Sequence, residues 1–197
     1  MKSKLKLKTI FLLPGFMMQA KDKPFSWLVK YLEAKGMRVV KVPINWKNRV
    51  LSQNAIEFID FYSKQKSEEN YVLGFSYGAV ITILTANILK PKKIFLCSLS
   101  PDFSEDREWM KTIEVKKYIG TRRFADTLTR SGRKIAQKLM IPSVVFYGEA
   151  EGKEFPQLVK RCKETVRLAK NSKLIVVEEA PHDINFPAYR EAIKKVI

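Results

Sequence analysis

The chain has 197 residues, of which 46% are hydrophobic and 29% are charged, as expected for one globular domain. Two cysteines and the lack of any periodic glycine or proline exclude a disulfide scaffold, a collagen and a repeat array. Lysine and arginine number 37 against 20 aspartate and glutamate, which gives a formal net charge of +17. This charge fits lysines spread over solvated helix faces, the interpretation that we adopt, or a nucleic acid or anionic surface as partner.

The first apolar stretch follows a basic N-terminus, as in a signal peptide. Pro14 and Gly15 interrupt residues 10–18, however, and charged residues follow at once, so we interpret this stretch as a β-strand with the loop after it. It is also too short to span a bilayer. Cys97 and Cys162 show no disulfide pattern. These features together predict a cytoplasmic protein with reduced thiols and no transmembrane segment.

Short apolar runs rich in β-branched and aromatic residues alternate with segments of helical spacing along the whole chain. Their nearly continuous apolar character is typical of strands buried on both faces of a parallel sheet. The alternation therefore predicts an α/β protein, a three-layer sandwich around a mostly parallel sheet. The predicted strands are residues 9–13, 38–42, 71–73, 94–97, 144–147 and 174–177.

Five segments carry helical spacing. Gly36 is a stop signal for the first and Pro91 for the third, whereas the second has a less regular apolar stripe at Ile56, Ile59, Phe61 and Tyr62. The predicted helices cover residues 25–32, 56–62, 79–89, 155–169 and 189–196.

Residues 101–140 interrupt this rhythm and contain no convincing strand. From Ser104 to Met140 the segment carries ten basic and five acidic side chains. One interpretation is a pair of amphipathic helices that cover the sheet. The other is a small helical cap over a ligand site, because loops after the carboxyl ends of strands bind ligands in α/β proteins. We treat residues 1–197 as one domain and leave both interpretations open.

The sharpest motif is the pentapeptide from Gly74 to Gly78, which stands between a predicted strand and a predicted helix. At this place the G-x-S-x-G pattern predicts a tight turn that strains the backbone of Ser76 and exposes its hydroxyl at the carboxyl end of the sheet. Gly74 and Gly78 would let the strand and the helix approach closely. Ser76 is therefore a candidate nucleophile.

A serine hydroxyl needs a base, and His182 is the only histidine of the chain. It follows the last predicted strand, so it belongs to the same edge of the sheet as Ser76. A carboxylate must orient the imidazole. Glu149 and Glu151 both follow the strand at residues 144–147, and Asp102 after the preceding strand is a third choice. Asp183 is too close to His182 in sequence to reach its ring.

A tetrahedral intermediate also needs donors for its oxyanion. The backbone N–H of Tyr77, directly after Ser76, is one candidate. The loop after the first strand offers the N–H of Phe16, and Gly15 would let that backbone approach the substrate. Trp27, Trp46, Trp109 and the cluster at residues 16–18 are candidates for an apolar acyl pocket or for core positions.

With these motifs in this order, the sequence resembles the α/β-hydrolase superfamily over nearly its whole length. The resemblance rests on LLPGF at residues 12–16, GFSYGA at 74–79, FYGEAE at 146–151 and APHD at 180–183. It implies a minimal, six-stranded sheet that lacks the first two strands of the family. The first strand would be central, the second beside it at one edge, and the others would follow in turn on the opposite side.

The resemblance also bears on the acid, because the family acid stands three residues after the glycine that ends its strand. It implies Glu151 ahead of Glu149, with glutamate in place of the usual aspartate. Pro14 replaces the usual histidine of the oxyanion loop, whose donor is a backbone N–H.

We therefore expect a serine hydrolase of the carboxylesterase or thioesterase type, with a small acyl ester or thioester as substrate. Ser76 would form an acyl-enzyme, His182 would act as general base and acid, and Glu151 would orient His182. The sequence shows no metal-ligand cluster and no nucleotide-binding glycine pattern, so it implies no metal and no cofactor. The alternative is a non-catalytic, hydrolase-like binding protein whose basic surface holds an anionic partner, and the sequence leaves the oligomeric state open.

Overall fold

A computed structural model of the chain describes residues 7–197. Six strands form one sheet in which all neighbours are parallel, in the order β2-β1-β3-β4-β5-β6. The α/β class, the six strands and their order are confirmed, and each observed boundary lies within two residues of the prediction. The strands are β1 (Lys8–Leu13), β2 (Arg38–Lys41), β3 (Glu69–Phe75), β4 (Lys93–Cys97), β5 (Ser143–Gly148) and β6 (Ser172–Val177).

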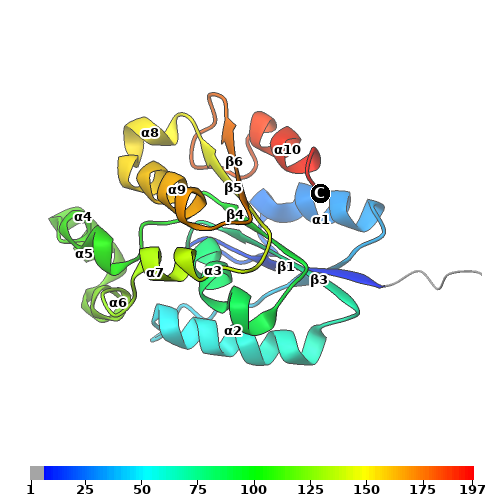
Figure 1. The fold of residues 1–197 in the computed structure, drawn as a ribbon, viewed down its shortest axis with the longest axis horizontal. Helices are drawn as coiled ribbons and strands as arrows, with labels where there is room; N and C mark the ends of the chain where they lie inside the picture. The colour runs from blue at the N-terminus through cyan, green and yellow to red at the C-terminus, as the bar shows by residue number, and fades with distance from the viewer. Residues whose placement is uncertain (1–6) are drawn as a thin grey trace, which may run out of the picture.

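Helices cover both faces of the sheet, which gives the predicted three layers (Figure 1). The longer helices are α1 (Ser26–Ala34), α2 (Leu51–Gln65), α3 (Tyr77–Leu89), α9 (Pro156–Leu168) and α10 (Pro187–Lys194). The short ones are η1 (Lys23–Phe25), η2 (Ser104–Asp106), α4 (Arg107–Met110), α5 (Ile113–Ile119), α6 (Thr121–Thr127), α7 (Gly132–Gln137) and α8 (Glu151–Glu154).

The apolar residues of the central strands divide between two cores because successive side chains point to opposite faces. On β1, Ile10 and Leu12 pack with the buried residues of α1 and α10. Phe11 and Leu13 pack with the buried residues of α2, α3 and α9. All four β1 residues are fully buried, and each such side chain contributes about 1.5–3 kcal/mol to folding. The sheet is thus a rigid, doubly covered platform.

Two helical predictions need correction. In α2 the expected stripe is only partly correct: Tyr62 is buried, but Ile56 is 66% exposed, and the other buried residues are Leu51, Asn54, Ala55 and Phe58. The expected stripe contained neighbouring residues that face different directions on a helix of 3.6 residues per turn. The 101–140 segment, meanwhile, forms four short α-helices and not a pair.

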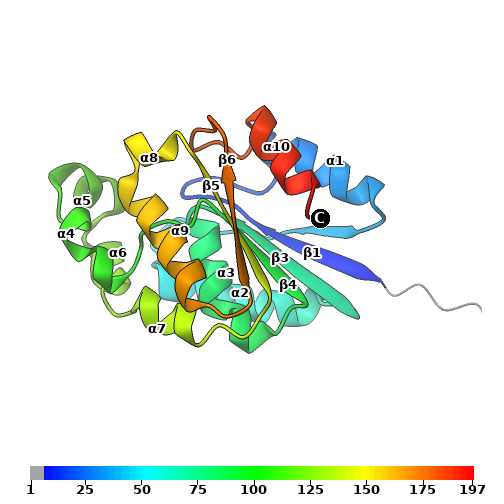
Figure 2. The ribbon, with the colours of Figure 1, turned by 45° about the horizontal axis from the view of Figure 1, so that its top comes forward.

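The parallel strands end at one edge of the sheet, and α4, α5 and α6 gather at that end (Figure 2). α7 instead packs against α9 and α3. Thus one part of the 101–140 segment stands over the carboxyl ends of the strands, and its last helix joins the layer on the sheet. None of the described helices is both long and apolar enough to cross a bilayer.

Candidate active site

Ser76 occupies the sharp turn between β3 and α3. Its backbone has φ 54° and ψ −118°, an unfavourable conformation for a residue with a Cβ. The glycines make this turn sterically feasible, as predicted. A Cβ on Gly74 would lie 2.3 Å from the carbonyl oxygen of Gly78, and a Cβ on Gly78 would lie 2.4 Å from that of Leu13. The backbone N–H of Ser76 also donates to Cys97 on the adjacent strand (2.8 Å).

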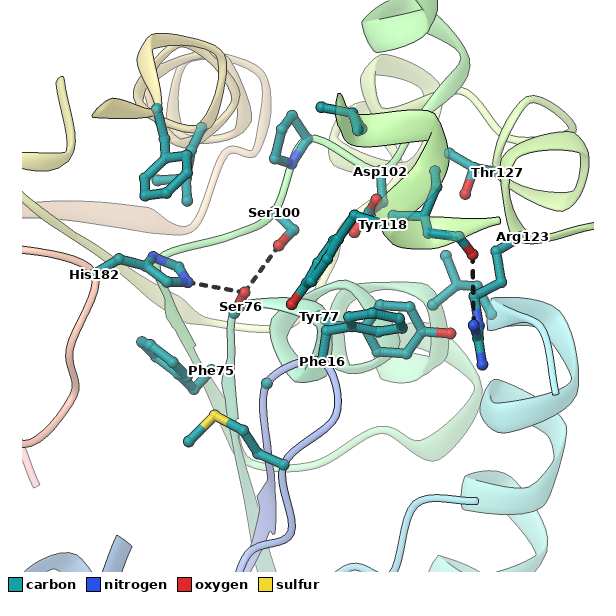
Figure 3. Close-up of a pocket in the computed structure, with 18 of the residues that line it drawn as sticks. Phe16, Phe75, Ser76, Tyr77, Ser100, Asp102, Tyr118, Arg123, Thr127 and His182 are labelled. Carbon is teal, nitrogen blue, oxygen red and sulfur yellow. Dashed lines mark hydrogen bonds between the residues drawn. The ribbon is translucent and has the colours of Figure 1, made fainter. Parts of the chain in front are cut away.

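His182 reaches Ser76 from the loop between β6 and α10. Its Nε2 lies 3.1 Å from the Ser76 Oγ, and Figure 3 shows the ring directed at this hydroxyl. The rings of Phe75 and Phe155 flank the imidazole at centroid distances of 4.9 and 5.5 Å. These contacts hold the imidazole plane in place. The structure thus brings Ser76 and His182 together at one edge of the sheet, where the sequence analysis expected both.

Glu151 lies behind His182, at the start of α8. Its Oε1 is 2.5 Å from the His182 Nδ1, and its Oε2 accepts a hydrogen bond from the N–H of Gly148 (2.7 Å). The side chain is fully buried. A carboxylate on Nδ1 fixes the tautomer in which Nδ1 carries the proton and Nε2 accepts one from Ser76.

The β5 and β6 loops hold this pair in register through backbone hydrogen bonds. The N–H of Ala150 donates to the carbonyl of Ala180 (3.1 Å), and that of Glu149 donates to Val177 (2.8 Å). Gly148 is required here, because a Cβ on it would lie 2.1 Å from the Ala180 carbonyl oxygen.

The other two candidate acids lie elsewhere. Glu149 is exposed, and its Oε2 accepts a hydrogen bond from the backbone N–H of Glu179 (3.2 Å). Asp102 lines the cavity above Ser76, away from the Nδ1 side of His182. Asp183 accepts a hydrogen bond from the N–H of Asn185 (2.8 Å) and makes none with His182.

The two predicted oxyanion donors stand beside the nucleophile. Tyr77 follows Ser76 at the first position of α3, and Phe16 belongs to the loop after β1. A Cβ on Gly15 would lie 3.3 Å from the Ser76 Cβ, so this loop lies against the nucleophile. Among the described residues, neither backbone N–H has a protein acceptor, and both are therefore available to a substrate oxygen.

Ser100 contacts the nucleophile candidate Ser76, and the sequence analysis did not identify it. Its Oγ lies 3.0 Å from the Ser76 Oγ. Because Ser76 has one hydroxyl proton, a Ser76 that donates to His182 must accept its second hydrogen bond from Ser100. The available signal was the place of Ser100 just beyond β4, the strand next to β3.

A cavity of about 620 Å³ opens above Ser76. Its walls are mostly apolar and come from the β1 loop, from α3, from the β4 loop and from α4 to α6. Of the residues that the sequence left open between pocket and core, Phe16, Met18 and Trp109 line the cavity, whereas Trp27 and Trp46 do not, and Met17 is 64% exposed. Trp46 instead packs edge-on against the ring of Phe16 at 5.3 Å.

Two polar side chains of α6 connect this helix to the body of the domain. Arg123 donates to the carbonyls of Arg49 (3.0 Å) and Trp46 (2.5 Å), and its guanidinium lies over the Phe16 ring at 5.0 Å. Asp126 accepts hydrogen bonds from the N–H (3.0 Å) and the hydroxyl (2.5 Å) of Ser52 at the start of α2. The roof of the cavity is therefore joined to the loop that carries Phe16.

Asp102 is an acid of the cavity wall with a strongly perturbed pKa. Burial raises the pKa of its carboxyl to about 7, Asp106 adds to this effect, and Arg130 partly opposes it. Among residues 7–197, no three His, Cys, Asp or Glu side chains are grouped so that they could hold a metal ion.

The comparisons with known proteins rest on structure. The sequence matches no protein-family model and no curated protein. The fold is similar to that of Est1E from Butyrivibrio proteoclasticus with bound ferulic acid (TM-score 0.77, 14% identity, 98% of this chain and 87% of that one).

Two further similar structures are of proteins named as α/β hydrolases. One is MGS-MChE2, an α/β hydrolase enzyme from the sediment metagenome of the lagoon of Mar Chica (TM-score 0.72, 16% identity, 97% of this chain and 89% of that one). The other is mouse α/β hydrolase domain-containing protein 10 (TM-score 0.74, 10% identity, 96% and 90%). With its parallel six-stranded sheet, helices on both faces and these neighbours, the chain has the α/β-hydrolase fold.

Proposed function

We propose that this protein is a serine hydrolase that cleaves a carboxylic ester or a thioester. The observation that carries the proposal is the hydrogen-bonded series from Ser76 Oγ to His182 Nε2 (3.1 Å) and from His182 Nδ1 to Glu151 Oε1 (2.5 Å). Further support comes from the cavity above Ser76 and from the hydrolase names of similar structures. Because those similarities concern the fold, the site geometry is the main argument.

In the proposed reaction, Ser76 Oγ attacks the carbonyl carbon of the substrate while His182 Nε2 takes the hydroxyl proton. Glu151 stabilises the imidazolium that results. The N–H groups of Phe16 and Tyr77 donate to the oxyanion. The tetrahedral intermediate collapses, His182 returns the proton to the leaving alcohol or thiol, and an acyl-enzyme remains on Ser76.

Water then attacks the acyl carbon, and His182 again accepts and returns a proton, which releases the carboxylic acid and restores Ser76. The part of the 101–140 segment that spans α4 to α6 acts as a cap, since its side chains form the roof of the cavity. Trp109 and Tyr118 supply apolar surface there for the acyl or alcohol group.

The test is labelling with a fluorophosphonate, read by intact mass, on the wild type, Ser76→Ala and Ser63→Ala. We expect one adduct on the wild type and on Ser63→Ala, whose serine is exposed and remote, and none on Ser76→Ala. All three proteins must show the same thermal transition. An adduct that persists in Ser76→Ala, or a folded wild type without any adduct, contradicts the proposal. The second result would favour the non-catalytic alternative.

A panel of matched esters and thioesters then separates the two substrate types.

A further inference from the structure

The cavity above Ser76 has few polar groups, and most of them already have partners. Arg123 uses its N–H groups on backbone carbonyls, Asp183 accepts from Asn185, and Glu114 is exposed. Among the acids of the cavity wall, Asp102 combines partial burial with a carboxylate for which no hydrogen bond is found among the described residues. In Figure 3 it lies with Tyr118 on the opposite side of Ser76 from His182.

Arg130, the cation that partly opposes the rise in the pKa of Asp102, is engaged with another carboxylate. Arg130 pairs with Asp126 at 2.7 Å, with both side chains about 15% exposed. Arg161 pairs with Asp106 at 2.7 Å and with Glu164 at 2.5 Å. Within the part of the chain that the structure describes, no hydrogen bond or ion pair to the Asp102 carboxyl is found, and the residue is half-buried on the wall of an apolar cavity.

Partial burial of such a group is unfavourable for folding, since it has lost part of its hydration and no hydrogen bond among the described residues replaces it. The raised pKa of this carboxyl is the electrostatic consequence of the same burial. A ligand in this cavity that donates a hydrogen bond to the carboxyl would replace the hydration that the group has lost.

Building on the proposed hydrolase activity, we propose that Asp102 accepts a hydrogen bond from a hydroxyl or ammonium group on the part of the substrate that fills this cavity. The substrate class is then an ester or thioester with an acyl or alcohol group that is mainly apolar and carries one hydrogen-bond donor. Phe16, Trp109 and Tyr118 contact the apolar portion. Asp102 selects the donor, because a substrate without it leaves the carboxyl desolvated and unpaired.

The test uses ethyl esters of straight-chain acids of six to ten carbons in three forms: unsubstituted, ω-hydroxy and ω-amino. A mirror series of acetates places the same groups on the alcohol. The readout is the ratio of kcat/KM for a donor-bearing ester to that for its unsubstituted partner. Because this ratio compares two substrates of one enzyme, a general loss of activity in a variant cancels.

For the wild type we expect a ratio of about 10 or more at the chain length that reaches Asp102, the effect of one hydrogen bond to a charged or polar partner. In Asp102→Leu the ratio falls to about 1 or below. Asp102→Asn, which keeps a side-chain carbonyl oxygen but carries no negative charge, retains more of the preference for hydroxyl than of the preference for ammonium. Comparison of the ω-hydroxy and ω-amino esters thereby identifies the donor. Glu108→Gln, an exposed change on α4 outside the cavity, keeps the wild-type ratio.

Equal ratios in the wild type and Asp102→Leu at every chain length overturn the inference. In that case the wild type still hydrolyses unsubstituted esters and takes up the fluorophosphonate, so the proposed function stands. A wild type that turns over no ester of either series and takes up no fluorophosphonate contradicts the proposed function, and this inference with it. Thermal unfolding of both Asp102 variants shows that each ratio comes from folded enzyme.

Discussion

At the scale of single residues, Glu149 and Glu151 show how burial distinguishes two identical side chains. They stand two positions apart after β5. Glu151 is fully buried and contacts His182, whereas Glu149 points to solvent and accepts one hydrogen bond from the backbone of Glu179. Only Glu151 can fix the tautomer of His182.

We therefore expect Glu151→Gln to lower kcat/KM by about 10³- to 10⁴-fold, because the amide no longer stabilises the imidazolium. Glu149→Gln serves as the matched control, with a change below about 3-fold, since its carboxylate is exposed. Steady-state kinetics on one activated ester measures both. If Glu149→Gln proves the more damaging of the two, the acid is assigned to the wrong residue.

Ser100 offers a second prediction at this scale. Its hydroxyl donates to Ser76 Oγ, and this hydrogen bond strengthens as Oγ gains negative charge during proton transfer to His182. We expect Ser100→Ala to lower the acylation rate by about 3- to 10-fold, the effect of one hydrogen bond. The rate of fluorophosphonate adduct formation measures this step directly. An unchanged rate means that the Ser100 contact has no influence on nucleophile activation.

Asp102 also predicts a pH dependence of stability. The pKa of its carboxyl is about 7 in the folded protein against an ordinary value of 3.8. Between about pH 4 and pH 7 the unfolded chain has released this proton and the folded protein keeps it, so the stability from this group falls as pH rises. The slope is at most about 1.4 kcal/mol per pH unit.

Asp102→Asn removes this slope, since an amide does not titrate. Urea unfolding of the wild type and Asp102→Asn at several pH values from 4 to 8 should give curves that diverge, with the variant gaining relative stability as pH rises. Parallel curves would mean that the carboxyl titrates alike in the folded and unfolded states.

At the scale of elements, the cap depends on its connection to α2. Asp126 on α6 accepts two hydrogen bonds from Ser52 and pairs with Arg130. Burial by itself raises the pKa of this carboxyl, but the hydrogen bonds from Ser52 and Arg130 outweigh it and lower the pKa overall. The stability that this carboxylate provides is thus present at neutral pH and is lost on acidification.

We expect Asp126→Ala to reduce the free energy of unfolding by about 2 kcal/mol, since it leaves the N–H and hydroxyl of Ser52 without their acceptor. It should also raise KM and speed proteolysis within residues 101–140. Asp60→Ala is the control, because Asp60 pairs with Lys64 on an exposed helix face and contributes little. Equal behaviour of the two variants would show that Asp126 does not hold the cap in place.

At the scale of the whole molecule, the net charge of +17 opposes the compact state through repulsion among like charges. Several basic residues of the 101–140 segment are paired or bonded, such as Lys111 with Glu108, Arg130 with Asp126 and Arg133 with Glu164. These pairs reduce the free positive charge of the 101–140 segment without removing the overall excess.

Added salt screens this repulsion, so we expect Tm to rise by several degrees between about 50 and 500 mM NaCl, where the Debye length falls well below 10 Å. Sodium acetate should give a similar rise, which separates screening from binding of one particular anion. A Tm that falls with salt would mean that attractive surface pairs outweigh the repulsion.

The residue pattern by itself determined the strands and the turn at Ser76, whereas the order of the strands came from the resemblance to the α/β-hydrolase superfamily. Nearly continuous apolar runs identify buried parallel strands. A strand and a helix that meet this closely require glycine at the turn, and Gly74 and Gly78 supply it here. Such features are local, so they can be read from neighbouring residues. The position of His182 at the same edge as Ser76 follows from the parallel arrangement.

The tertiary structure alone decided what depends on contacts between distant segments. The residues near Glu149 and Glu151 do not reveal which one is buried. The packing of the β5 loop against the β6 loop decides it, and Glu151, which the resemblance favours, is the buried one. Two hydrogen bonds likewise join residues far apart in sequence: Ser100 with Ser76, and Ser52 with Asp126. The surroundings of Asp102 also come from distant segments. Hydrogen bonding and desolvation act over a few ångströms in space, whatever the separation along the chain.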